Sequence, residues 1–205
     1  MFNFRATHMR ERSNRWIFGT MLVFGIVGLL VSFILSVDEI ELIKHPDAIL
    51  SCSLNVVLNC STVMKTWQAS VFGFPNMLIG LMSFPVVISV AVVALNGAKL
   101  PRWFWIAANS CYGLGALFAY WLFFQSIYSI QVLCPWCLVI TLSTTILLAT
   151  ITHYNLRENT FGFSKKANQK VQALLHRDVG KLVTATWIVL LMALVVVKFG
   201  DSLLV

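Results

Sequence analysis

The chain has 205 residues, of which 59% are hydrophobic and only 11% are charged. Soluble domains are much less apolar, so this composition indicates an integral membrane protein. The apolar segments take up most of the length and leave no room for an added soluble domain of about 100 residues. A formal net charge of +7 is typical of a membrane chain with basic cytoplasmic segments, and we therefore expect no nucleic-acid partner.

Five apolar runs are long enough to cross a bilayer, which needs about 20 residues per helix. No alternating strand pattern competes with them, so we predict helices, whose backbone groups hydrogen-bond within the segment. The fold class is therefore all-α integral membrane, with a four-helix transmembrane bundle plus a fifth transmembrane helix. The predicted spans cover residues 16–36, 73–95, 103–127, 134–153 and 182–199.

Basic residues gather in three segments that alternate with the spans. Arginines precede the first span, Lys99 and Arg102 lie between the second and the third, and a cluster of cations follows the fourth. Such segments stay in the cytoplasm. We therefore expect a basic cytoplasmic N-terminus (1–15), an exterior loop (37–72) with Asp38, Glu39 and Glu41, a basic cytoplasmic loop (155–181), and a fifth helix with a short exterior tail (182–205).

Four of the five cysteines form two close pairs on the predicted exterior side. Cys52 and Cys60 lie in the exterior loop, and Cys134 and Cys137 lie at the exterior end of the fourth span. The exterior is the oxidising side, where paired thiols form disulfides. Cys111 differs, because it lies mid-span in a stripe of small residues, and we expect it to pack between helices. That stripe consists of Ala107, Cys111, Gly115 and Ala119.

The second pair lies in the stretch "CPWC" at the start of the fourth span. Pro135 suits the first helical position, which makes Cys134 the predicted N-cap and places Cys137 in the first turn. The partial positive charge of a helix start stabilises a thiolate, although nearby hydrocarbon opposes ionisation. We therefore predict a redox-active pair. The alternatives are a static disulfide and a metal site, which uses the same spacing.

The first pair closes an exterior loop, since eight positions separate Cys52 from Cys60. Met64, Trp67 and Val71 follow at helical spacing and predict a short amphipathic helix that begins at Cys60. In this arrangement Cys60 faces the membrane and Cys52 is the more accessible sulfur. Two dithiols on one side favour an electron relay by thiol–disulfide exchange, with a lipid-soluble quinone as the final acceptor.

Together these motifs resemble the bacterial vitamin K epoxide reductase homologues. The shared pattern is C-x7-C, then "FGFPN", then CxxC at the start of the fourth helix, over roughly residues 16–154, a four-helix catalytic core. DsbB-type quinone reductases have the opposite order, with the CxxC in the first exterior loop. The resemblance implies that Cys137 faces the quinone, that Cys134 exchanges with Cys60, and that Cys52 takes electrons from a protein partner.

The resemblance also implies a quinone contact through Asn76 of "FGFPN". Two positions depart from the family pattern. Thr66 stands where a serine is common, which keeps the hydroxyl and leaves it a candidate quinone contact beside Asn76 and Cys137. Thr141 stands where animal members have a quinone-binding tyrosine, so their head-group contacts and epoxide reduction do not transfer directly.

The expected function is disulfide-bond generation at a bacterial plasma (inner) membrane. A separate DsbA-type, thioredoxin-fold partner outside the cytoplasm would be oxidised, and menaquinone or ubiquinone would be reduced. One alternative is reduction of vitamin K epoxide by the same cysteines. A zinc or copper thiolate site is a non-enzymatic alternative, but no histidine lies near the CxxC, and we expect no metal. Spans two to four lack the charged residues that mark ion-coupled transport.

Overall fold

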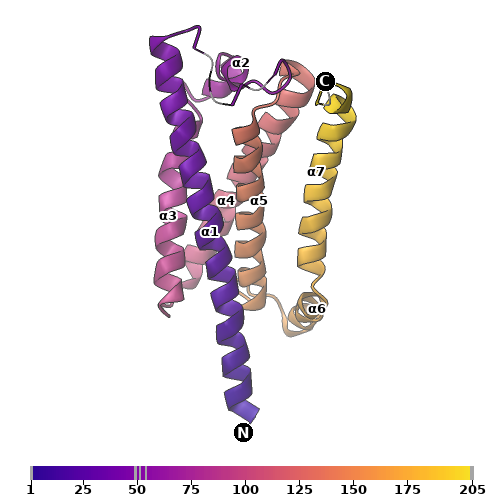
Figure 1. The fold of residues 1–205 in the computed structure, drawn as a ribbon. Helices are drawn as coiled ribbons and strands as arrows, with labels where there is room; N and C mark the ends of the chain where they lie inside the picture. The colour runs from indigo at the N-terminus through magenta and orange to yellow at the C-terminus, as the bar shows by residue number, and fades with distance from the viewer. Residues whose placement is uncertain (1, 49, 51, 54, 204–205) are drawn as a thin grey trace.

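The computed structural model describes residues 2–48, 50, 52–53 and 55–203 as a bundle of long helices (Figure 1). Within this part of the chain, five helices are long and apolar enough to cross a membrane, which confirms the predicted fold class. Short helices and one isolated bridge between Leu58 and Leu133 complete the described structure. The elements are α1 (Phe2–Lys44), α2 (Cys60–Met64), η1 (Trp67–Ser70), α3 (Met77–Leu95), α4 (Arg102–Gln125), η2 (Ser126–Ile130), α5 (Pro135–Arg157), α6 (Lys165–His176) and α7 (Val179–Leu203).

Helix α1 continues to Lys44, beyond the predicted end of the first span. Asp38, Glu39 and Glu41, which we expected in the exterior loop, therefore stand on a helix, and that boundary was wrong. The physical reason is that apolar residues keep their helical spacing after the span. Leu42 is buried and packs in the same cluster as the loop cysteines, so the last turns of α1 form a wall beside them.

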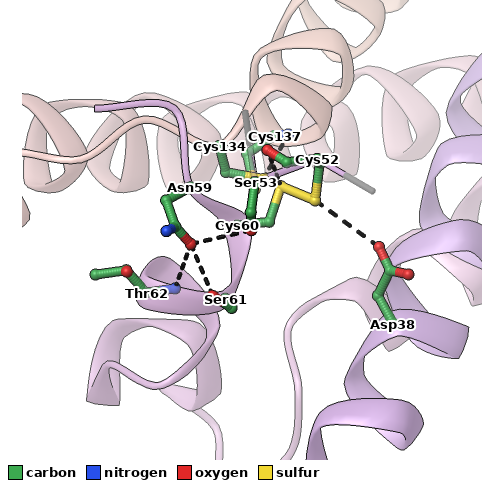
Figure 2. Close-up of a disulfide and its surroundings, with 9 residues drawn as sticks. All are labelled: Asp38, Cys52, Ser53, Asn59, Cys60, Ser61, Thr62, Cys134 and Cys137. Carbon is green, nitrogen blue, oxygen red and sulfur yellow. Dashed lines mark hydrogen bonds between the residues drawn. A yellow bond between two sulfur atoms is a disulfide. The ribbon is translucent and has the colours of Figure 1, made fainter. Parts of the chain in front are cut away.

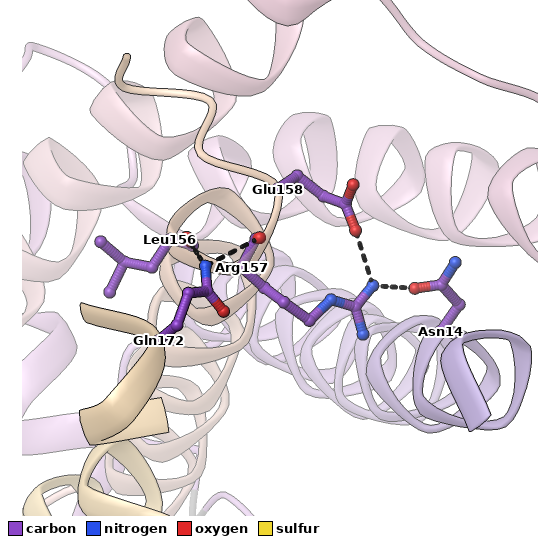
Figure 3. A network of polar contacts seen from close by, with 5 residues as sticks. All are labelled: Asn14, Leu156, Arg157, Glu158 and Gln172. Carbon is purple, nitrogen blue, oxygen red and sulfur yellow. Dashed lines mark hydrogen bonds and ion pairs between the residues drawn. The ribbon is translucent and has the colours of Figure 1, made fainter. Parts of the chain in front are cut away.

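The predicted basic loop 155–181 contains helix α6, which packs at the foot of α5 (Figure 3). The Gln172 amide donates to the backbone oxygens of Leu156 and Arg157 at 3.2 and 3.1 Å, and so satisfies two carbonyls at the end of α5. The guanidinium of Arg157 donates to Asn14 of α1 and to Glu158. These contacts tie the end of α5 to α1 and α6.

Helices α1 and α3 lie against each other because glycines remove side chains from their contact. A Cβ added at Gly28 would stand 2.3 Å from the Phe84 ring, and one added at Gly80 would stand 2.2 Å from the Ser32 hydroxyl. Both distances are far below van der Waals contact. Phe84 and Val87 of α3 then fill the core together with Met21 of α1.

Gly28→Ala should therefore destabilise the bundle by about 1–3 kcal/mol, since the Phe84 ring must leave its position. Thermal unfolding in detergent should show a lower midpoint for this variant. Gly113→Ala is the matched control, because no heavy atom lies within 4 Å of a Cβ added at Gly113. Equal midpoints for the two variants would contradict the close approach of α1 and α3.

Candidate active site

The "CPWC" pair begins helix α5 as the sequence predicts. Cys134 is the N-cap with extended backbone angles, Pro135 occupies the first turn, and the Cys134 sulfur accepts the N–H of Cys137 at 3.3 Å. A cap of this kind satisfies one of the donors that a helix start leaves free. Cys134 is 2% exposed, whereas Cys137 is partly buried, and both are free thiols in this structure.

A disulfide joins Cys52 to Cys60 in the loop between α1 and α3 (Figure 2). Cys60 is the first residue of α2, and Asn59 caps this short helix. The Asn59 side-chain oxygen accepts the N–H of Thr62 and the hydroxyls of Ser61 and Ser53. Sequence reasoning assigned no role to Asn59, although an asparagine directly before a short helix is a recognisable N-cap signal.

The two pairs meet because the loop is paired with the residue that precedes "CPWC". The Leu133 N–H donates to the Val57 carbonyl at 2.8 Å, and the Asn59 N–H donates to the Leu133 carbonyl at 3.0 Å. The following residues on the two segments are Cys60 and Cys134, whose sulfur atoms lie 3.3 Å apart. Such a separation brings a thiol into contact with the sulfur that it would attack.

The helix start favours the ionised form of Cys134. The backbone N–H of Cys137 donates to the Cys134 sulfur at 3.3 Å. The partial positive charge at the start of α5 acts in the same direction. Since the thiolate is the form that exchanges with disulfides, the helix start prepares Cys134 for reaction with its neighbour.

Cys52 is less accessible than we expected, because its side chain is only 4% exposed, close to the 0% of Cys60. The carboxylate oxygen of Asp38 stands 3.8 Å from the Cys52 sulfur (Figure 2). Sequence reasoning missed this neighbour because Asp38 was assigned to the loop rather than to α1. An ionised carboxylate at this distance opposes negative charge on Cys52.

A cavity of about 370 Å³ opens inside the bundle below the cysteines. Its volume is in the range of small-molecule sites, and its walls are largely apolar. Both Cys134 and Cys137 line it, together with Asn76 of α3 and Phe118 of α4. From Asn76 the lining follows α3 down to Ser83, about 10 Å along the helix axis, so the cavity is elongated.

Asn76, directly before α3, is one of the polar residues that line this cavity. Its amide nitrogen donates to the Gln68 carbonyl at 2.7 Å, while its buried side-chain oxygen has no hydrogen-bond partner in the part of the chain that the structure describes. A buried polar atom without a partner is costly unless a ligand satisfies it. Thr141 also lines the cavity, but its hydroxyl donates to the Cys137 carbonyl at 2.9 Å.

The structure does not place Thr66 with Asn76 and Cys137. The Thr66 hydroxyl donates to the Val63 carbonyl at the end of α2, and Thr66 is absent from the cavity lining. Cys111 also differs from its expected packing role, because it is exposed and lines the cavity. Helix α4 packs on α5 through another face, where Tyr120 hydrogen-bonds Thr145.

Among the described residues, no group of three or more His, Cys, Asp or Glu side chains is placed to hold a metal ion. The cysteines themselves offer thiol–disulfide chemistry, since the site has one disulfide, two free thiols and a cavity at the second pair. Exchange between Cys60 and Cys134 would move a disulfide from one pair to the other.

Comparison with known proteins gives one informative result. No curated protein matches the chain. A scan against family models matches residues 20–152 to the vitamin K epoxide reductase family. The matched segment is more than half of the chain and includes all four paired cysteines. The resemblance inferred from the motifs is thereby confirmed, and the chain belongs to the vitamin K epoxide reductase family of membrane oxidoreductases.

Proposed function

We propose that the protein generates disulfide bonds by passing electrons from a DsbA-type, thioredoxin-fold partner to a quinone. The observation that carries this proposal is the 3.3 Å separation of the Cys60 and Cys134 sulfurs, with Cys137 on the wall of a cavity. The Cys52–Cys60 pair would exchange its disulfide with the partner, and the Cys134–Cys137 pair would reduce the quinone.

In the first step, a thiolate of the reduced partner attacks the Cys52 sulfur, and Cys60 leaves as a thiolate. Asp38 favours this direction, because its carboxylate opposes negative charge on Cys52 and so makes Cys60 the better leaving sulfur. The second partner thiol then attacks its own mixed-disulfide sulfur and releases Cys52. The partner leaves with a new disulfide, and the loop pair holds two thiols.

In the second step, the Cys60 thiolate attacks the Cys134 sulfur of an oxidised "CPWC" pair, and Cys137 leaves as a thiolate. Cys52 then attacks Cys60, which restores the loop disulfide and leaves Cys134 and Cys137 reduced. The observed arrangement, with a Cys52–Cys60 disulfide and free Cys134 and Cys137, corresponds to the state after this transfer.

In the third step, the reduced "CPWC" pair gives two electrons and two protons to a quinone, which becomes the hydroquinone. Cys134 and Cys137 return to the disulfide. The cavity suits a quinone, since it presents the Asn76 oxygen, which has no partner among the described residues, and its walls are largely apolar. Asn76 retains one N–H for a quinone carbonyl, and its oxygen can accept a hydroquinone hydroxyl.

We further infer that the protein lies in a bacterial plasma membrane with its N-terminus in the cytoplasm. The basic residues in the N-terminal part of α1, between the end of α3 and the start of α4, and around α6 support this orientation. Both cysteine pairs then face the exterior, where exported proteins acquire disulfides. Menaquinone and ubiquinone both fit this assignment, because each has a carbonyl-bearing head group and an apolar tail.

The direct test is reconstitution of the purified protein in lipid vesicles with a quinone and a reduced thioredoxin-fold partner. We expect partner-dependent quinone reduction, followed by ultraviolet absorbance, with one disulfide formed per quinone reduced. Vitamin K epoxide with a dithiol is the competing substrate in a parallel assay. Efficient turnover of the epoxide without turnover of quinone would replace the proposed function by epoxide reduction.

Asn76→Ala should raise the KM for quinone about 10- to 100-fold, since a buried hydrogen bond to the substrate is worth about 1–3 kcal/mol. Initial rates at varied quinone concentration measure the effect. Asn96→Ala is the matched control, because Asn96 makes a similar amide-to-backbone bond at the other end of α3, in an exposed position. Similar KM values for the two variants would remove Asn76 from the quinone site.

A further inference from the structure

Helix α7 lies outside the segment that matches the family, and most of its described side chains are exposed, although the Trp187 ring contacts Tyr120 of α4. The side chains of α7 are described up to Gly200. Among them only Val195 and Phe199 are buried, and each is 6% exposed. Both lie near the end of α7 that reaches the cysteine-bearing end of the bundle (Figure 1). The tightest contact of this helix is therefore local rather than distributed along its length.

Val195 and Phe199 pack in one cluster with Phe123, Ile127 and Leu133. Leu133 is fully buried there. The partly buried residues against this cluster include two from the cysteine loop, Val57 and Leu58, and one from the start of α5, Leu138. The end of α7 thus packs against the junction between the loop and the "CPWC" segment.

The backbone of this junction is not helical. Gln131 adopts a left-handed conformation (φ 58°) where the chain leaves η2, and helix α5 begins only at Pro135. Between them, the backbone N–H and C=O of Leu133 bond to the loop at Val57 and Asn59. Any rotation or withdrawal of Leu133 would break these bonds and separate Cys60 from Cys134, the residues that follow.

We propose that α7 is a positioning element for the thiol exchange. Val195 and Phe199 hold the Leu133 side chain, and Leu133 in turn holds the loop bridge that brings the Cys60 sulfur to the Cys134 sulfur. This inference rests on the proposed relay and extends it to a helix outside the family core. In this role α7 raises the effective concentration of the Cys60 sulfur at the Cys134 sulfur, although α7 contacts neither sulfur itself.

The test uses the full chain with Cys137→Ala and Cys111→Ala, which leaves three cysteines and one disulfide. In this chain the Cys134 thiolate attacks the Cys60 sulfur, forms the Cys60–Cys134 disulfide and releases the Cys52 thiolate. The reaction needs no outside oxidant. Rapid alkylation and mass spectrometry give the ratio of the Cys60–Cys134 form to the Cys52–Cys60 form at equilibrium.

Adding Phe199→Ala should lower this ratio about tenfold, because the bridge no longer holds Cys134 at Cys60. Phe199→Leu should recover most of it, since leucine refills much of the contact. Val197→Ala is the matched control on the same helix, because Val197 is 87% exposed, and it should leave the ratio unchanged. If Phe199→Ala loses its helical circular dichroism, Val195→Ala, a smaller truncation of the same contact, replaces it.

The outcomes separate the two proposals. Absence of any Cys60–Cys134 disulfide in the chain with an intact α7 would overturn the proposed relay itself. A normal Cys60–Cys134 fraction that stays the same in Phe199→Ala and in Val195→Ala would overturn the positioning role of α7 and leave the relay standing.

Discussion

Replacing Cys137 with alanine should abolish quinone reduction, with a loss of at least about 10³-fold in the rate of partner-driven turnover. Cys137 lines the cavity and is the partly buried sulfur of the pair, whereas Cys134 is 2% exposed and faces Cys60. Without Cys137, the "CPWC" segment cannot form the disulfide that accounts for the two electrons. Quinone absorbance in reconstituted vesicles measures the loss.

Cys111→Ala is the matched control for this prediction. Cys111 is also a free cysteine that lines the same cavity, but it lies on α4 and has no second cysteine in its own helix. Its replacement should leave turnover within about twofold of the unaltered protein. A Cys137→Ala variant that still reduces quinone, or an equal loss in Cys111→Ala, would show that Cys137 is not the sulfur at the quinone.

Local sequence features predicted the parts of the fold that depend on neighbouring residues. The length of an apolar run determines a span, and a proline after a cysteine determines the N-cap geometry of Cys134. Both arguments need only a few consecutive residues and the physics of helix ends and bilayers.

Features that depend on residues far apart in the chain were missed or misplaced. The Leu58–Leu133 bridge joins segments that no local pattern relates. The pairing of Cys60 with Cys134 was expected only from the family resemblance, and this bridge is what brings the two sulfurs together. Asp38 was misplaced because an acidic residue after an apolar run usually ends a span, whereas here the buried Leu42 extends the helix. Burial in a tertiary contact overrode the local signal.

The exposed position of Cys111 has a similar origin. Small residues at every fourth position are typical of close helix packing, but a sequence does not say which partner lies opposite. In this bundle the stripe meets a cavity, and glycines on α1 and α3 provide the close approach instead. Small residues therefore allow close packing between α1 and α3, whereas on α4 they leave space for the cavity.

Burial of the Cys52, Cys60 and Cys134 sulfurs limits their reaction with small thiols in solution. All three are at most 4% exposed, so solvent thiols have little access to the sulfurs while the loop is seated. The structure therefore favours transfer between neighbours over leakage to small thiols. Only Cys137, on the cavity side, is partly buried rather than buried.

Replacing Cys60 with alanine should stop transfer from the loop to "CPWC", with a loss of at least about 10³-fold in partner-driven quinone reduction. The reason is geometric, since the Cys60 sulfur is the one that lies 3.3 Å from Cys134. After one addition of reduced partner, alkylation and mass spectrometry should find "CPWC" still oxidised in this variant and reduced in the unaltered protein.

Cys52→Ala is the informative comparison, because it removes the other half of the same disulfide. Here Cys60 still meets Cys134, so a Cys60–Cys134 disulfide should accumulate, because the Cys52 thiol that would resolve it is absent. Alkylation and mass spectrometry should detect this disulfide. The two variants thus lose partner-driven activity for different reasons. A Cys52–Cys134 disulfide that accumulates in Cys60→Ala, without a Cys60–Cys134 disulfide in Cys52→Ala, would reverse the order of the two loop cysteines. It would make Cys60, with its 0% exposure, the sulfur that meets the partner.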